Sequence, residues 1–178
     1  NTTVLWNNLR ILNCSDIGLH IQGCKRYVFV NAAIDGCGEE ALRIETRTSN
    51  AVFINFWCED NLITHSSGTK YQAYIEDAVG EPSSIVFMGS EFNNPHAPAG
   101  TAAQKQLYAK CANLTLMGNT WSYGGITNVV APMSNIDGTT NVSMLGDNTP
   151  LSDFTIASGV KINTHGVYGD MTGVLNTN

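Results

Sequence analysis

Three acidic residues near the start of the chain have types and spacing that suit acid–base chemistry. Asp16 is followed 23 residues later by the adjacent pair Glu39 and Glu40. Glycoside hydrolysis needs two carboxyl groups across a sugar, about 5–5.5 Å apart for retention or about 6.5–9.5 Å for inversion. Residues on neighbouring strands of a sheet lie about 4.8 Å apart, so either separation is within reach. This interpretation makes Glu39 or Glu40 the general acid and Asp16 the base or nucleophile.

Other interpretations of the acidic residues stay open. Acidic residues at turn positions can serve only as turn formers. A second acidic pair, Glu59 and Asp60, has His65 nearby and is the runner-up catalytic cluster. A lyase reaction would instead need a basic residue to take a proton beside a uronate, and Arg43 could serve. The sequence predicts no metal site and no cofactor.

Aromatic residues at strand ends support a sugar-binding surface. Trp57, Trp121 and Tyr123 come where the chain is expected to turn outward, and exposed indole or phenol rings stack on sugar faces. Packing in the core is the alternative for each ring. With Arg43 and His65, these residues form the predicted substrate-binding set.

The composition limits the classes of partner. Only 13% of residues are charged and the net charge is −6. A nucleic-acid binder needs a clustered basic face, and a membrane span needs about 20 apolar residues in a row; neither is predicted. The cysteines at 14, 24, 37, 58 and 111 have no metal-site spacing and predict buried thiols, with Cys14, Cys37 and Cys58 as an inward-pointing stack.

These residues must be positioned by a repeat of about 24 residues. Segments 1–8, 25–32 and 49–56 align on Val4, Val28 and Val52, and later segments continue the series at Ile85, Leu114 and Val142. Each segment alternates apolar and polar residues and then reaches Asn or Gly, which is typical of a short strand that runs into a turn. The pattern predicts an all-β fold, a right-handed parallel β-helix of about 5–6 rungs over residues 1–148.

Departures from the repeat predict loops and a distinct end. The long rungs should insert loops at Glu59–Tyr71 and Asn93–Gln106, where binding groups are often displayed. Residues 149–178 still alternate but lack the paired strands, which predicts an extended cap or a segment that packs in a trimer. The first residues already have a strand pattern, so we expect the sequence to be a fragment of a longer protein.

Two sequence features resemble a known superfamily. Strands open with an Asn-x-Thr-x-x-x-Asn pattern, and Cys14 begins a Cys-x-x-x-Gly-Leu-x-Ile strand entry. These rungs resemble the pectate-lyase-like β-helix superfamily, which includes pectin-degrading enzymes and bacteriophage tailspikes. The acidic segments 15–19 and 38–44 are similar to the two acidic rungs of polygalacturonases, with a Glu pair where that family has an Asp pair.

The low charge and the distinct end make the chain most similar to a phage tailspike or receptor-binding protein. This resemblance implies a homotrimer in the virion tail that recognises, and in some cases depolymerises, bacterial surface polysaccharide. A secreted hydrolase or lyase of the polygalacturonase or pectate-lyase type is the first alternative. A structural β-helix without enzymatic activity is the second.

Overall fold

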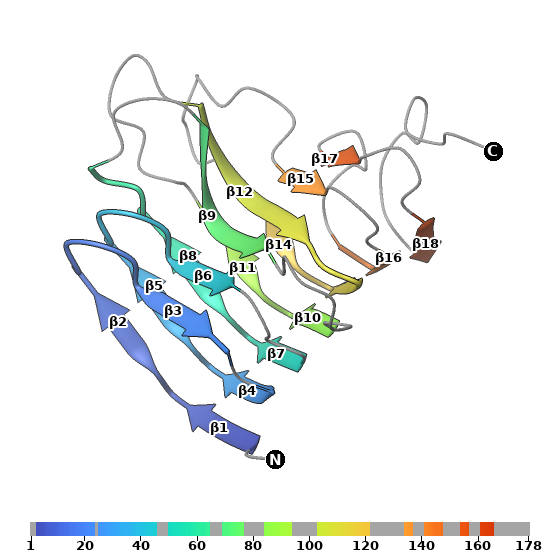
Figure 1. Cartoon of the computed structure of the whole chain (residues 1–178), viewed down its shortest axis with the longest axis horizontal. Coiled ribbons are helices and arrows are strands. Elements are labelled where there is room, and N and C mark those ends of the chain that lie inside the picture. Colours follow the sequence, from blue (N-terminus) through green and yellow to red (C-terminus); the bar gives the residue numbers. More distant parts are fainter. Residues whose placement is uncertain are drawn as a thin grey trace.

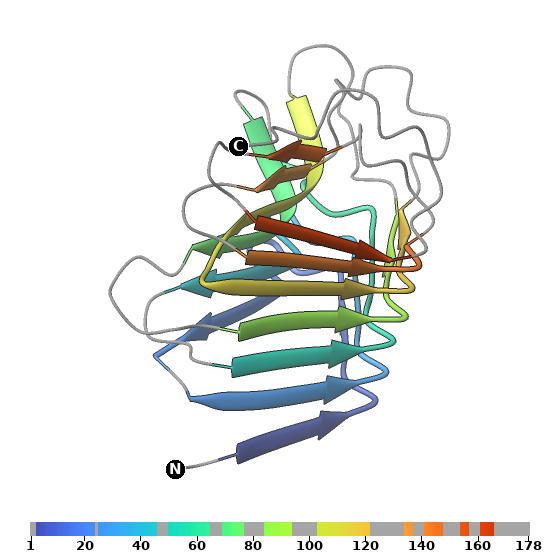
Figure 2. The ribbon, with the colours of Figure 1, turned by 90° about the vertical axis from the view of Figure 1, so that its right-hand side faces the viewer.

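The chain is coiled so that successive strands fall into three parallel sheets (Figure 1). A computed structural model describes residues 3–23, 25–45, 50–64, 69–76, 84–93, 103–121, 134–136, 141–147, 154–156 and 161–165. The first sheet, seen with its strands stacked in Figure 2, contains β1 (Thr3–Asn7), β4 (Arg26–Val30), β7 (Asn50–Ile54), β10 (Ser84–Met88), β13 (Asn113–Met117), β16 (Asn141–Leu145) and β18 (Lys161–His165).

The other two sheets complete each rung. The second sheet contains β2 (Arg10–Leu12), β5 (Ala33–Asp35), β8 (Trp57–Glu59), β11 (Glu91–Phe92) and β14 (Thr120–Trp121). The third sheet contains β3 (Leu19–Gln22), β6 (Leu42–Glu45), β9 (Thr69–Glu76), β12 (Ala103–Lys110), β15 (Ser134–Ile136) and β17 (Phe154–Ile156). Every described rung pairs in parallel with the next, so the predicted parallel β-helix is confirmed.

The turn between the first and second sheets uses one backbone conformation in every described rung. Its key residue has a positive φ, which Gly and Asn adopt more readily than other residues. The six residues are Asn8, Asn31, Asn55, Gly89, Gly118 and Gly146, with φ between 53° and 68°. The Asn or Gly that ends each predicted strand is therefore a structural requirement of the turn.

The predicted register is correct for some rungs and shifted by one residue for two. Val28 pairs with Val52 as expected. Val4, however, pairs with Tyr27, and Ile85 pairs with Ala51. A shift of one residue exchanges the inward and outward faces of a strand. Aligning the turn residues instead of the valines gives the observed register.

The interior is a column of stacked rings and aliphatic side chains. Phe29, Phe53 and Phe87 lie on consecutive strands of the first sheet, with ring centroids 5.1 Å and 4.9 Å apart. All three are buried. Full burial of such a side chain contributes about 1.5–3 kcal/mol, so this column is a major source of stability.

The four described cysteines are free thiols, but Cys14, Cys37 and Cys58 do not form the predicted stack of three. Cys37 and Cys58 are buried and Cys14 is half-buried. Cys14 and Cys37 occupy matching turn positions, whereas Cys58 lies in β8 and pairs with Ile34. Burial and the hydrogen bond with Cys14 raise the pKa of Cys37 to about 12, so this thiol is not a reactive thiolate at neutral pH.

The two long insertions are at the same corner of neighbouring rungs. They connect β8 to β9 and β11 to β12, and both of these later strands are eight residues long. The predicted loops Glu59–Tyr71 and Asn93–Gln106 are shorter than expected at their C-terminal ends, because β9 begins at Thr69 and β12 at Ala103, and these two residues pair. These two insertions can extend the third sheet because the added residues of β9 and β12 form hydrogen bonds with each other.

Strands also occur within the C-terminal segment predicted to be distinct. β17 pairs with β15, and β18 pairs with β16. The boundary at residue 148 stays a prediction. In the part of the chain that the structure describes, no helix is long and apolar enough to cross a membrane.

Candidate functional site

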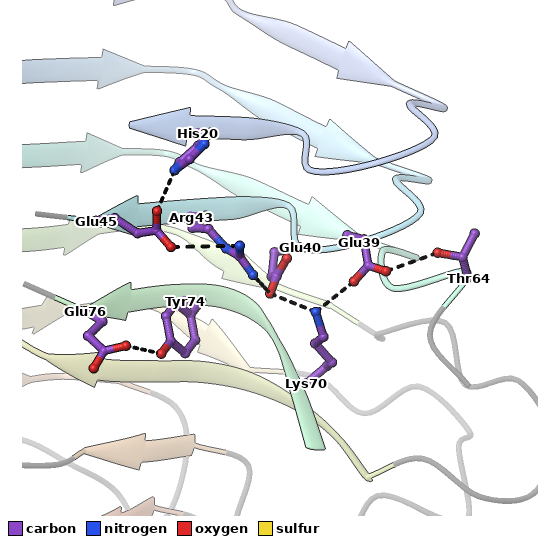
Figure 3. Close-up of polar contacts among 9 residues, drawn as sticks. All are labelled: His20, Glu39, Glu40, Arg43, Glu45, Thr64, Lys70, Tyr74 and Glu76. Atoms are coloured by element: carbon purple, nitrogen blue, oxygen red, sulfur yellow. Dashed lines mark hydrogen bonds and ion pairs between the residues drawn. The ribbon is translucent and has the colours of Figure 1, made fainter. Parts of the chain in front are cut away.

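The predicted catalytic pair, Glu39 and Glu40, lies at the corner between the second and third sheets. Both side chains contact one cation, since Lys70 Nζ lies 2.9 Å from Glu39 Oε2 and 3.4 Å from Glu40 Oε1 (Figure 3). The chain bends here, so neighbouring side chains need not point to opposite faces. Thr64 adds a hydrogen bond to Glu39 Oε1 at 3.4 Å.

Glu40 is the structural centre of this network. It is only 2% exposed, and its Oε1 accepts a 2.7 Å hydrogen bond from Arg43 Nη2. Burial lowers the pKa of Lys70, but the hydrogen bond and the negative charges of Glu39 and Glu40 outweigh this and leave that pKa above its ordinary value. A buried carboxylate between two protein cations has little access to a polysaccharide, and losing either cation would leave its charge poorly compensated.

The network continues along the outer face of the third sheet. Arg43 Nη1 lies 3.8 Å from Glu45 Oε1, and Glu45 Oε2 lies 2.9 Å from His20 Nε2 (Figure 3). The Arg43 guanidinium also lies 5.7 Å from the ring centroid of Tyr74, a cation–π geometry. Arg43, predicted to bind substrate or act as a base, is thus held by protein groups.

Asp16 is placed next to the pair by the stacking of rungs but does not join the network. Its backbone carbonyl accepts a 3.3 Å hydrogen bond from the amide of Glu39. The side chain is exposed. Among the described residues, its carboxylate forms no ion pair, so the three predicted carboxyls do not share one contact network.

A separate groove lies over the turn between the first and second sheets. It has a volume of about 470 Å³ and is lined by residues of four successive rungs: Asn8, Arg10, Asn31, Ala32, Ala33, Asn55, Trp57 and Glu91. Arg10, Ala33, Trp57 and Glu91 occupy matching positions on neighbouring strands. The small side chain of Ala33 leaves room beside the indole of Trp57.

One side of the groove is a ladder of asparagine side chains. Asn31 Nδ2 donates to Asn8 Oδ1 at 3.3 Å, and Asn55 Nδ2 donates to Asn31 Oδ1 at 2.8 Å. All three residues are exposed. An amide has two N–H groups and two acceptor lone pairs, so each ladder bond leaves donors and acceptors for a ligand. The 23- and 24-residue spacing of these asparagines was the sequence signal that could have revealed them.

A group of carboxylates follows the lining residues Ala33 and Trp57 along the second sheet. Asp35 and Glu59 are paired on neighbouring strands of the second sheet. Partial burial, then the negative charges of Asp60, Asp35 and Glu91, raise the pKa of Glu59. Partial burial and the charge of Asp60 raise the pKa of Asp35. The runner-up cluster of Glu59 and Asp60 therefore borders the groove, and Asp35 is a member that the sequence did not suggest.

The predicted aromatic residues have different environments. Trp57 is half-buried and lines the groove. Trp121, in contrast, is 6% exposed and stacks on Phe92 with centroids 4.3 Å apart, so its ring belongs to the core rather than to an exposed binding surface. Tyr123 and His65 lie outside the described residues.

Among the described residues, no three His, Cys, Asp or Glu side chains are arranged to hold a metal ion. Comparison of the chain with protein-family models, curated proteins and solved structures finds no match.

Proposed function

We propose that this protein is a carbohydrate-recognition β-helix of the phage-tailspike type, which binds bacterial surface polysaccharide in the groove beside Trp57. The groove combines an aromatic ring with a row of amides, which together suit the apolar faces and the hydroxyl groups of sugars. The single observation that carries the proposal is that Trp57 and the asparagine ladder line the same groove. A place in the virion tail and a homotrimeric state belong to the same proposal.

The test is binding of the purified protein to an array of bacterial capsular and O-antigen polysaccharides. We expect Trp57→Ala to weaken binding at least about tenfold, because the ring supplies much of the apolar contact. The matched control is Tyr108→Ala, which removes an aromatic side chain from the third sheet. Equal binding by wild type and Trp57→Ala would contradict the proposal.

A second candidate function is hydrolysis of the bound polysaccharide. The observation that favours it is the pairing of two carboxyls, Asp35 and Glu59, on neighbouring strands next to the groove-lining residues Ala33 and Trp57. Partial burial and neighbouring negative charges raise the pKa of both. A carboxyl that keeps its proton closer to neutral pH can act as a general acid, while a second one acts as base or nucleophile. In this proposal the acid–base pair is Asp35 and Glu59 instead of Asp16, Glu39 and Glu40.

Release of reducing ends from a bound polysaccharide tests the hydrolase. Asp35→Asn and Glu59→Gln should each lower the rate at least about a hundredfold, whereas the control Glu39→Gln should retain activity if the variant folds. Loss of activity in Glu39→Gln with full activity in Glu59→Gln would return the active site to the originally predicted pair. Binding without any product would leave recognition as the function.

A further inference from the structure

The direction and length of the groove are set by the stacking of rungs. Its lining begins with Asn8 in the first rung and reaches Glu91 in the fourth. Three inter-strand steps of about 4.8 Å give a span of about 14 Å. The rung spacing is close to the advance per residue of an extended pyranose chain. The ladder of Asn8, Asn31 and Asn55 can therefore present one amide to each of about three successive sugars.

The charge around the groove is strongly asymmetric. Arg10 and Glu91 are the charged residues of its lining. Asp35 and Glu59 follow the lining residues Ala33 and Trp57 by two positions in β5 and β8, so they face the same side of the sheet. Asp60 comes next in the chain, and its charge acts on both of these carboxyls. Among the described residues, none of these four carboxylates forms an ion pair, whereas Glu39, Glu40 and Glu45 all contact cations. A carboxylate-bearing sugar placed here would be repelled by several like charges at short range.

We infer that the groove binds about three consecutive sugar residues in a chain lying parallel to the stack axis, and that it selects segments without acidic sugars. This inference rests on the proposed function and specifies its ligand. The amide ladder and Trp57 supply attraction that depends little on sugar charge. The carboxylates supply specificity, because they repel polysaccharide chains that contain uronates and so exclude them as competing ligands.

The polysaccharide array tests the charge preference when its members are sorted by the presence of uronic acids. Binding that depends on Trp57 should be confined to polysaccharides with neutral or amine-bearing segments. If Trp57-dependent binding were instead strongest for uronate-rich polysaccharides, the inference would fail while the proposed function survived. If no polysaccharide showed Trp57-dependent binding, the proposed function itself would fail, and the inference with it.

A variant with fewer carboxylates shows whether uronates are excluded from the groove by charge repulsion or by its shape. The triple variant Asp35→Asn, Glu59→Gln, Glu91→Gln keeps side-chain size nearly constant, and we expect it to gain at least about tenfold affinity for oligogalacturonate at low salt. The control triple variant Asp16→Asn, Glu45→Gln, Glu76→Gln removes the same number of charges elsewhere. A similar gain in both variants would show a general charge effect and overturn the inference.

Ligand length is tested with size-fractionated oligosaccharides from the best-bound polysaccharide. Affinity should rise up to about three sugar residues and then level off. Ala33→Leu, which fills the space beside Trp57, should remove this length dependence together with most of the affinity. Affinity that continued to rise well beyond this length, or that levelled off at one sugar, would overturn the proposed orientation along the stack.

Discussion

At the scale of single residues, the same residue type has opposite roles in neighbouring parts of the fold. Glu40 is buried and contacts both Arg43 and Lys70, so its charge is compensated within the protein. Glu59 is half-buried beside other carboxylates, and its pKa is raised. Partner charges and solvent access distinguish the structural carboxylate from the one available for chemistry or recognition.

Because Glu40 and Arg43 form a buried ion pair, removing the arginine should lower the stability of the fold. Arg43→Met leaves the Glu40 carboxylate buried with Lys70 as its remaining cationic contact, so the free energy of unfolding should fall by about 2–4 kcal/mol. Urea denaturation measures the change. Arg26→Met, which removes an exposed arginine from β4, is the control and should change stability by less than about 0.5 kcal/mol. Equal effects of the two substitutions would contradict a structural role for the network.

A second buried carboxylate, Asp147, should make the stability of the fold depend on pH. Burial raises the pKa of Asp147 from 3.8 to about 6, although hydrogen bonds from Asn119 act in the opposite direction. Because the folded-state pKa is raised, the protonated form favours folding. The resulting stabilisation is complete below about pH 4 and is lost as the pH rises through about 6.

Asp147→Asn should remove this dependence, because the amide stays neutral while its oxygen can still accept the hydrogen bond of the Asn119 amide. The variant should be more stable than wild type at pH 7 by an amount on the order of 2 kcal/mol and similar to it at pH 4. Thermal unfolding at several pH values measures this. Asp16→Asn controls for the loss of one negative charge. An unchanged stability difference between pH 4 and pH 7 would contradict the prediction.

At the scale of elements, the turn between the first and second sheets determines where strands stop. Each described rung has Asn or Gly with positive φ at this point. In the first three rungs the asparagine side chains also line the groove, so one sequence position serves both the turn and the candidate site. In the later rungs glycine satisfies the backbone requirement alone.

Gly118 allows the backbone requirement to be separated from packing, because a Cβ atom there would have open space around it. Gly118→Val should lower the free energy of unfolding by about 2 kcal/mol, since a β-branched residue is strained at positive φ. Gly118→Asn should be nearly neutral, as asparagine occupies the equivalent position in three other rungs. Chemical denaturation of both variants gives the comparison, and equal destabilisation would exclude backbone conformation as the cause.

At the scale of the whole molecule, the rungs form one stack in which each strand pairs with equivalent strands of neighbouring rungs. A groove along such a stack is rigid, because its lining residues belong to paired strands and tight turns. Under the proposed function, the regular repeat of the rungs suits a ligand that is itself repetitive, such as a polysaccharide.

The proposed tailspike-type function predicts association of three chains. Sedimentation equilibrium should give a mass of about three times the 19.2 kDa of this chain. The measurement over a range of concentrations separates a stable trimer from weak self-association. A stable monomer would contradict the predicted oligomer while leaving the groove and its ligand to be tested independently.

The repeat, the parallel strands and the polar turns could all be predicted from the sequence, because alternation and the need for Asn or Gly are local properties of each rung. The sequence also indicated Trp57 and the Glu59–Asp60 pair, although it favoured Glu39 and Glu40. Only the tertiary structure brought Lys70 to that favoured pair, since an insertion of variable length separates them in the chain. Trp57 and Trp121 both follow short apolar segments, and sequence reasoning treated them alike. The register between rungs places Trp57 outward beside Ala33 and Trp121 inward on Phe92, because neighbouring positions on a strand face opposite sides of the sheet.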